Sequence, residues 1–63
     1  MFSVELHRKG VPAPSIQKSN IQTIVEAEQF AASILQEPRI VGLESVVILE
    51  NGNPIRRIPA GTL

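Results

Sequence analysis

The sequence lacks cysteine, aspartate, tyrosine and tryptophan, and it contains a single histidine among 63 residues. Without cysteine no disulfide can form, and one histidine leaves no ligand set for a structural zinc site. A chain this short buries only about 60% of the surface that its unfolded form exposes, so we expect marginal stability. Small domains gain stability from disulfides, metals or oligomerisation, and here self-association or unusually good packing remains.

Signals for membranes and export are also missing. No apolar run approaches the roughly 18 residues that a membrane-spanning helix needs. The first residues show no basic region followed by an apolar core, so we expect no signal peptide. Hydrophobic residues make up 43% of the chain and charged residues 19%, a composition typical of a folded domain. Together with the absence of cysteine, these features predict a cytoplasmic protein with no membrane partner.

An excess of charge of one sign is absent as well. Six basic side chains balance six acidic ones, so nothing predicts a global attraction to nucleic acid or membranes. The distribution is nevertheless uneven. Residues 1–20 sum to +2, residues 21–50 to −4 and residues 51–63 to +2. The two ends of the chain are therefore basic and its middle is acidic.

Residues suited to catalysis are few. A Ser-His-Glu arrangement of His7 with Glu5 fails, because residues i and i+2 of a strand point outward in parallel. Glu26 and Glu28 are two positions apart on a predicted helix and so do not face each other. The four glycines are scattered, and no phosphate-binding loop is present. We therefore predict a protein that is not an enzyme, with no catalytic residue, no cofactor and no metal site.

The first two thirds of the chain predict a strand and a helix. Apolar and polar residues alternate over residues 2–7, which is typical of a strand with one apolar face, and the prolines of GVPAPS end it. Residues 15–22 are compatible with a short strand, a loop or an early helical turn. Apolar residues at helical spacing then predict a helix from about 24 to 36, with Thr23 and Glu26 as a capping box and Pro38 as its stop. SNIQ, just upstream, is an alternative start.

The last third predicts a hairpin. An unbroken apolar run is typical of a strand buried on both faces, and here it consists of Val46, Val47, Ile48 and Leu49. Asn51-Gly52 is a strong turn signal, because a type I′ turn needs positive φ at both central residues. Pro54 and Pro59 bracket the final strand, IRRI. A proline-bounded strand with two charges is typical of the edge of a sheet.

These elements predict one small α+β domain over residues 1–63, with the order β-α-β-β. We expect a three-stranded sheet, one helix packed on one face and a C-terminal β-hairpin. The preferred strand order has the apolar strand in the centre, with the first strand parallel to it through a right-handed crossover. An alternative order places the PIRRI strand in the middle, with all neighbours antiparallel. The prolines and arginines favour the first order.

The apolar run bears on oligomeric state. A single helix covers one face of such a sheet, and the chain has no further element for the other. A second copy would cover it, so we predict a homodimer or higher homo-oligomer that self-associates through Val46, Val47, Ile48 and Leu49. The alternative is a monomer with an apolar sheet face, since apolar atoms form over half of most protein surfaces.

The helix and hairpin together resemble known small domains. TIVEAEQFAASIL followed by SVVILENGNPIRRI is similar to small bacterial and phage domains that couple a capped helix to a hairpin with a glycine turn. This likeness covers about half of the chain. It consists of general features of capped helices and glycine-turn hairpins and points to no particular family or function.

Four basic residues are the remaining candidates for function. Arg8, Lys9, Arg56 and Arg57 would form one basic patch if the end of the first strand lay near the last strand. Such a patch would bind an acidic protein surface or phosphate backbones. RNA-binding sheets stack bases on aromatic residues, and both phenylalanines are expected in the core, which disfavours single-strand recognition.

Three functional hypotheses follow. The leading one is a non-catalytic protein-interaction module of a small bacterial or phage accessory protein, which binds a copy of itself or another protein. The second is a nucleic-acid binder that uses the basic patch. The alternative interpretation of the same arginines is that they only keep a sheet edge from pairing with another chain. A component of a larger enzyme is the third.

Overall fold

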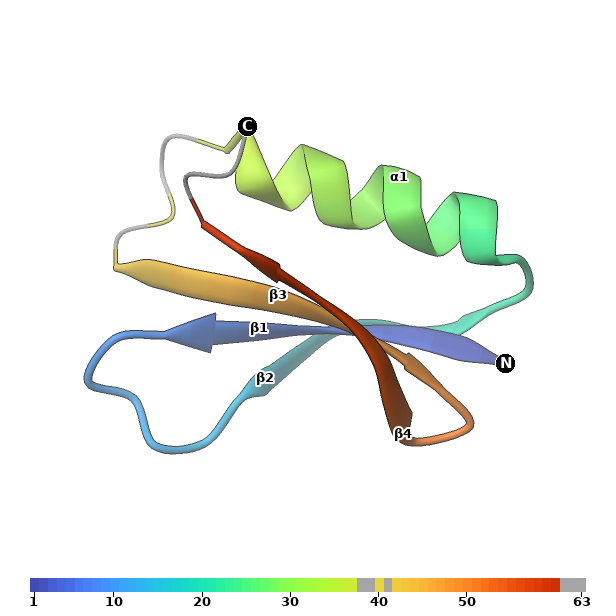
Figure 1. The fold of residues 1–63 in the computed structure, drawn as a ribbon, viewed down its shortest axis with the longest axis horizontal. Helices are drawn as coiled ribbons and strands as arrows, with labels where there is room; N and C mark the ends of the chain where they lie inside the picture. Colours follow the sequence, from blue (N-terminus) through green and yellow to red (C-terminus); the bar gives the residue numbers. More distant parts are fainter. Residues whose placement is uncertain (38–39, 41, 61–63) are drawn as a thin grey trace.

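The fold is a four-stranded antiparallel sheet with one helix on one face (Figure 1). The computed structural model describes residues 1–37, 40 and 42–60. Along the chain come β1 (Phe2–Arg8), β2 (Ser15–Ile21), α1 (Ile24–Leu35), β3 (Leu43–Glu50) and β4 (Asn53–Pro59). The strands lie in the order β2-β1-β3-β4. The α+β class and the central position of the apolar strand are thereby confirmed.

The prediction of three strands is wrong, because residues 15–21 form a strand of their own. β2 pairs with β1 along one edge of the sheet, although its side chains are exposed except at its two ends. Two register shifts interrupt this pairing, and Asn20 has a positive φ of 58°. Backbone groups along β1 need a partner on that side, and this tertiary demand outweighs the weak strand propensity of SIQKSNI.

The predicted parallel pairing of the first strand with the apolar strand is also wrong, because the additional strand β2 reverses the chain. β1 and β3 are adjacent but antiparallel. The hairpin between β1 and β2 reverses the chain before the helix begins, so the helical crossover joins β2 to β3 and skips over β1. The alternative order is wrong too, because β4, which carries the two arginines, pairs only with β3 and lies at the edge.

The helix begins where its cap predicts. Thr23 has an extended backbone, and its Oγ1 accepts a hydrogen bond from the Glu26 N–H at 3.2 Å. The helix ends at Leu35, one residue before the predicted end, and the Gln36 N–H still donates to the Ala32 carbonyl at 3.1 Å. Pro38, the predicted stop, lies outside the described residues.

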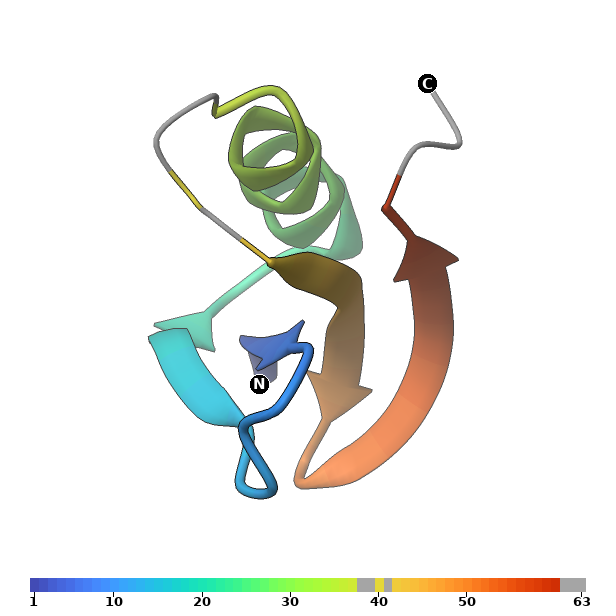
Figure 2. The same ribbon diagram turned by 90° about the vertical axis from the view of Figure 1, so that its left-hand side faces the viewer.

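The core lies between α1 and the sheet. Figure 2 looks along the strands and shows the helix above β1 and β3, with a strongly curved β4 at one edge. The helix contacts β1, β2 and β3. The buried core residues come from all of these elements: Val4, Leu6, Ile21, Ala27, Ala31, Ile34, Val46 and Ile48. Alanines on the buried helix face allow the helix to approach the sheet closely.

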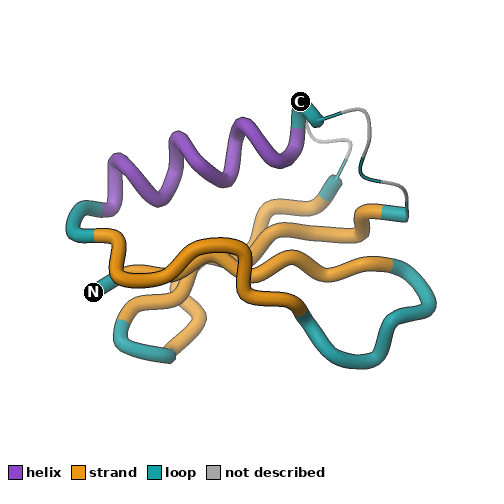
Figure 3. Tube along the Cα trace, turned by 180° about the vertical axis from the view of Figure 1, so that it is seen from behind, coloured by secondary structure: helices purple, strands orange, loops and turns teal. Residues whose placement is uncertain are grey.

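The β3–β4 hairpin has the predicted turn. Asn51 and Gly52 have φ values of 50° and 85°, as a type I′ turn requires. The Asn51 N–H also donates to the Met1 carbonyl at 2.9 Å, which ties the turn to the start of β1. Seen from behind, in Figure 3, this turn and the β1–β2 loop lie at opposite ends of the sheet. None of the described segments forms a helix long and apolar enough to cross a bilayer.

Candidate interaction surface

The sheet face opposite α1, called the open face below, carries no second layer among the described residues (Figure 2). Strand alternation and register define its members. Val46 and Ile48 belong to the core under the helix, so Ser45, Val47 and Leu49 point to the other side. Their cross-strand partners complete the face, namely Ser3, Glu5 and His7 on β1, Pro54, Arg57 and Pro59 on β4, and Ile16 on β2.

The apolar run on β3 divides between the two faces, as the sequence predicts for a strand with apolar residues on both sides. Val47 is only 6% exposed although none of the described elements covers it. Glu5 and Arg57 stand on either side of it in the neighbouring strands, and Ser45 beside it is also buried. Val47 is thus flanked by a long charged side chain on each neighbouring strand.

Two isoleucines on the open face are not shielded. Ile16 pairs with Glu5 across β1 and β2, and its side chain is 66% exposed. Ile55 lies two residues before Arg57, at the register shift of β4, and is 47% exposed. Sequence reasoning did not single out Ile16, because its segment could not be assigned to a strand. Leu49, beside the hairpin turn, is half-buried on the same face.

The two adjacent arginines point to opposite faces of β4. Arg56 faces the helix side, and its Nη1 pairs with Oε2 of Glu28 on α1. Arg57 lies on the open face, where its Nε donates to Ser45 Oγ at 3.2 Å and its Nη2 lies 3.4 Å from Glu44 Oε1. Each arginine therefore has an acidic partner within the chain.

Arg8 and Lys9 lie apart from these arginines. Arg57 and Arg56 are level with Glu5 and Val4 across β3, whereas Arg8 is three to four residues further along β1. With about 3.3 Å per residue and 4.8 Å per strand, the backbone separation is roughly 14–16 Å. Within the described structure, Arg8 and Lys9 have no carboxylate partner. The four basic residues do not share one patch.

His7 and Glu5 form a loosely matched pair on the open face. His7 Nε2 lies 4.0 Å from Glu5 Oε2, longer than a hydrogen bond, and it is screened from solvent without a hydrogen-bond partner. The Glu5 side chain is 15% exposed. No described residue donates a hydrogen bond to its carboxylate. The buried atom without a partner in this pair is therefore His7 Nε2, whereas the Glu5 oxygens reach solvent.

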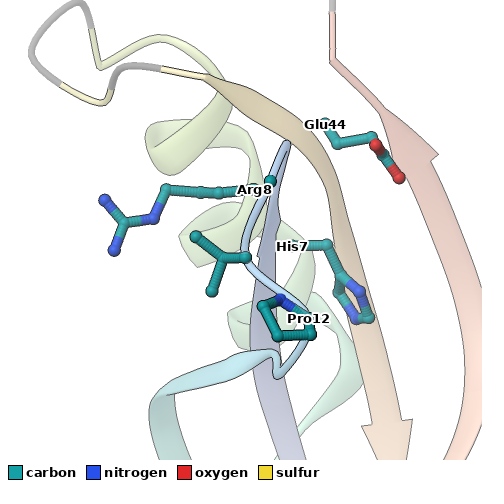
Figure 4. Close-up of a pocket in the computed structure, with 6 residues that line it drawn as sticks. His7, Arg8, Pro12 and Glu44 are labelled. Atoms are coloured by element: carbon teal, nitrogen blue, oxygen red, sulfur yellow. The ribbon is translucent and has the colours of Figure 1, made fainter.

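A shallow depression of about 420 Å³ lies at the end of the sheet, beside the β1–β2 loop. His7, Arg8, Pro12 and Glu44 line it, and Figure 4 shows Arg8 pointing away from His7 and Glu44. The polar groups do not converge on a common point, as a small-molecule site would require. In the part of the chain that the structure describes, no group of three or more His, Cys, Asp or Glu side chains could hold a metal ion.

Comparisons with protein-family models, with curated proteins and with solved structures give no match to this chain.

Proposed function

We propose that the protein is a non-catalytic interaction module that self-associates through the open face of its sheet, as an accessory protein of the bacterial or phage kind. The observation that carries this function is a sheet face that no described element covers and that holds Val47, Leu49 and the 47% exposed Ile55 on the adjacent strands β3 and β4. Solvent-exposed apolar side chains grouped on one face are typical of protein-binding surfaces.

The edge of β4 is poorly suited to association. The Ala60 N–H donates to the Glu44 carbonyl at 2.9 Å, so Ser45 and Pro59 form a non-hydrogen-bonded pair, and the nitrogen of Pro59 faces outward. The nitrogen of Pro54 also faces outward. Glu50 and Asn53 form the hydrogen-bonded pair that closes the two-residue turn, so the next pair, Leu49 with Pro54, is not hydrogen-bonded. Prolines therefore occupy two outward positions of this edge and remove the donors that an added strand would use.

The edge of β2 is blunted differently. Its pairing with β1 shifts register twice, and Asn20 adopts a left-handed backbone. Bulges twist an edge strand away from the flat geometry that a further strand needs. With both edges protected, self-association is expected to involve the open face rather than continuous pairing between sheets.

The size of the face sets the strength of association. The Cα atoms span 28 Å by 16 Å along the strands and across the sheet, an area of roughly 450 Å² per copy. Standard interfaces bury about 800 Å² per partner. We therefore expect a weak dimer with a dissociation constant in the micromolar range, not an obligate one.

Sedimentation equilibrium across micromolar to millimolar concentrations tests this function. We expect the native protein to shift from monomer to dimer. Ile55→Glu should weaken association about ten-fold or more, since burying an isoleucine is worth roughly 1.5–3 kcal/mol. Val25→Glu is the matched control, because Val25 is 57% exposed on the helix, away from the open face. A native protein that remains monomeric throughout, or equal effects of the two variants, would contradict the proposal.

Nucleic-acid binding is the alternative, and it is supported by Arg8 and Lys9, which have no carboxylate partner among the described residues. Filter binding with duplex and single-stranded DNA at two salt concentrations separates the hypotheses. Phosphate contacts weaken steeply with salt, whereas an apolar protein interface responds little. Retention that falls with salt and is lost in Arg8→Gln would favour this alternative.

A further inference from the structure

One row of the open face has a charge pattern that fits a copy of itself. Glu5 on β1, Val47 on β3 and Arg57 on β4 stand directly side by side in the register of the sheet. The row therefore consists of an acidic, an apolar and a basic side chain on three adjacent strands. Neighbouring strands are about 4.8 Å apart, so the two charges lie at equal distances on either side of Val47.

We propose that two copies associate about a two-fold axis that runs parallel to β3 above Val47. This arrangement rests on the proposed self-association and adds its geometry. A rotation of 180° about that axis exchanges the two sides of the row. It sets Glu5 of each copy opposite Arg57 of the other, and it sets the two Val47 side chains against each other. Two charge pairs then flank one apolar contact.

The unpaired carboxylate of Glu5 favours this partner. Its side chain is 85% buried, yet its nearest basic atom is His7 Nε2 at 4.0 Å. Its carboxylate oxygens reach solvent and accept no hydrogen bond from a described residue, so a guanidinium of a second copy can pair with them. Arg57 has donors to spare, because it makes two long contacts within its own chain and a guanidinium carries five N–H groups.

The other rows of β1, β3 and β4 are compatible with the same axis, and Ile16 on β2 lies outside the contact because β4 is the last strand on the opposite side. Along β3 the residues Ser45 and Leu49 meet their own counterparts, since they lie on the line of the axis. His7 falls opposite Pro59 of the second copy, and Ser3 opposite the region of Pro54 and Ile55. No row sets two like charges against each other. A self-complementary patch of this kind is what a two-fold interface requires.

Charge reversal tests the arrangement. Glu5→Lys alone sets lysine against arginine, and Arg57→Glu alone sets glutamate against glutamate, so each variant should dimerise at least about ten-fold more weakly than the native protein. A mixture of the two variants restores both attractive pairs. We therefore expect two monomeric variants to form a heterodimer when they are mixed, measured by sedimentation equilibrium with one variant fluorescently labelled.

The Arg56–Glu28 pair supplies matched controls. Glu28→Lys and Arg56→Glu reverse an ion pair on the helix side of the sheet and should leave dimerisation unchanged. Circular dichroism shows whether Glu5→Lys folds. If it does not, the exposed Arg57 tests the arrangement alone, because Arg57→Glu must weaken the dimer while Arg56→Glu must not.

The failures are distinguishable. If Ile55→Glu weakens a native dimer but charge reversals at 5 and 57 do not, or the mixed variants fail to associate, the open face is the interface and the two-fold arrangement is wrong. If the native protein is monomeric at every concentration, the proposed self-association and this arrangement both fall.

Discussion

The two faces of β3 are buried in different ways. Val46 and Ile48 are completely covered by the helix and by the side chains packed beneath it. Val47 is almost as inaccessible, but it is flanked by charged side chains on the neighbouring strands. Val46, Ile48 and Val47 thus have nearly the same exposure for different structural reasons. One face is closed by the helix, whereas the other is flanked by charged side chains of the sheet itself.

The largest effect is expected on the helix side. Ile48→Ala removes a fully buried side chain and leaves a cavity, which should lower the free energy of unfolding by about 2–5 kcal/mol. A domain of this size has little more stability than that to lose, so the variant should be largely unfolded at room temperature. Urea denaturation followed by circular dichroism measures the change. A loss below about 1 kcal/mol would show that the core under the helix is loosely packed.

A matched pair of substitutions compares the faces directly. Val46→Thr buries a hydroxyl under the helix without water and should lower stability by about 1–3 kcal/mol. Val47→Thr places the same hydroxyl between the charged side chains of Glu5 and Arg57, which can bond to it, so the loss should stay below about 1 kcal/mol. The same denaturation experiment gives both values. Equal losses would mean that the two faces are closed in the same way.

The smallest effect on stability is expected at the adjacent arginines. Arg56→Gln and Arg57→Gln each remove a largely exposed ion pair, and such pairs contribute roughly 0–1 kcal/mol. The two variants should therefore unfold at similar urea concentrations. They should differ in association, because only Arg57 lies on the open face. Similar dimerisation of both variants would remove the distinction between the faces.

The elements with strong local signals could be predicted from sequence. Thr23 with Glu26 marked the start of the helix, and Asn51-Gly52 marked the turn, since both signals depend on neighbouring residues alone. β2 could not be assigned, because SIQKSNI has no regular alternation, and two register shifts break its pairing. The predicted strand count and the parallel pairing failed with it.

The surface was less accessible to sequence reasoning than the fold. Alternation along a strand is enough to place the adjacent Arg56 and Arg57 on opposite faces. Glu5 and Arg57 flank Val47 only because of the register in which β1, β3 and β4 pair. Register shifts in the sheet change that register. The ion pair of Arg56 with Glu28 joins residues 28 positions apart. Such contacts follow from tertiary structure and leave no local pattern.

The most direct test of the central claim, that the open face is a self-association surface, is a dilution series followed by amide chemical shifts in NMR. We expect signals of Glu5, Val47, Ile55 and Arg57 to move with concentration along one curve that fits a micromolar dissociation constant, while signals from the exposed side of the helix, such as Val25, stay fixed. Shifts that are absent, or that concentrate on the helix or on the edge of β2, would contradict the account.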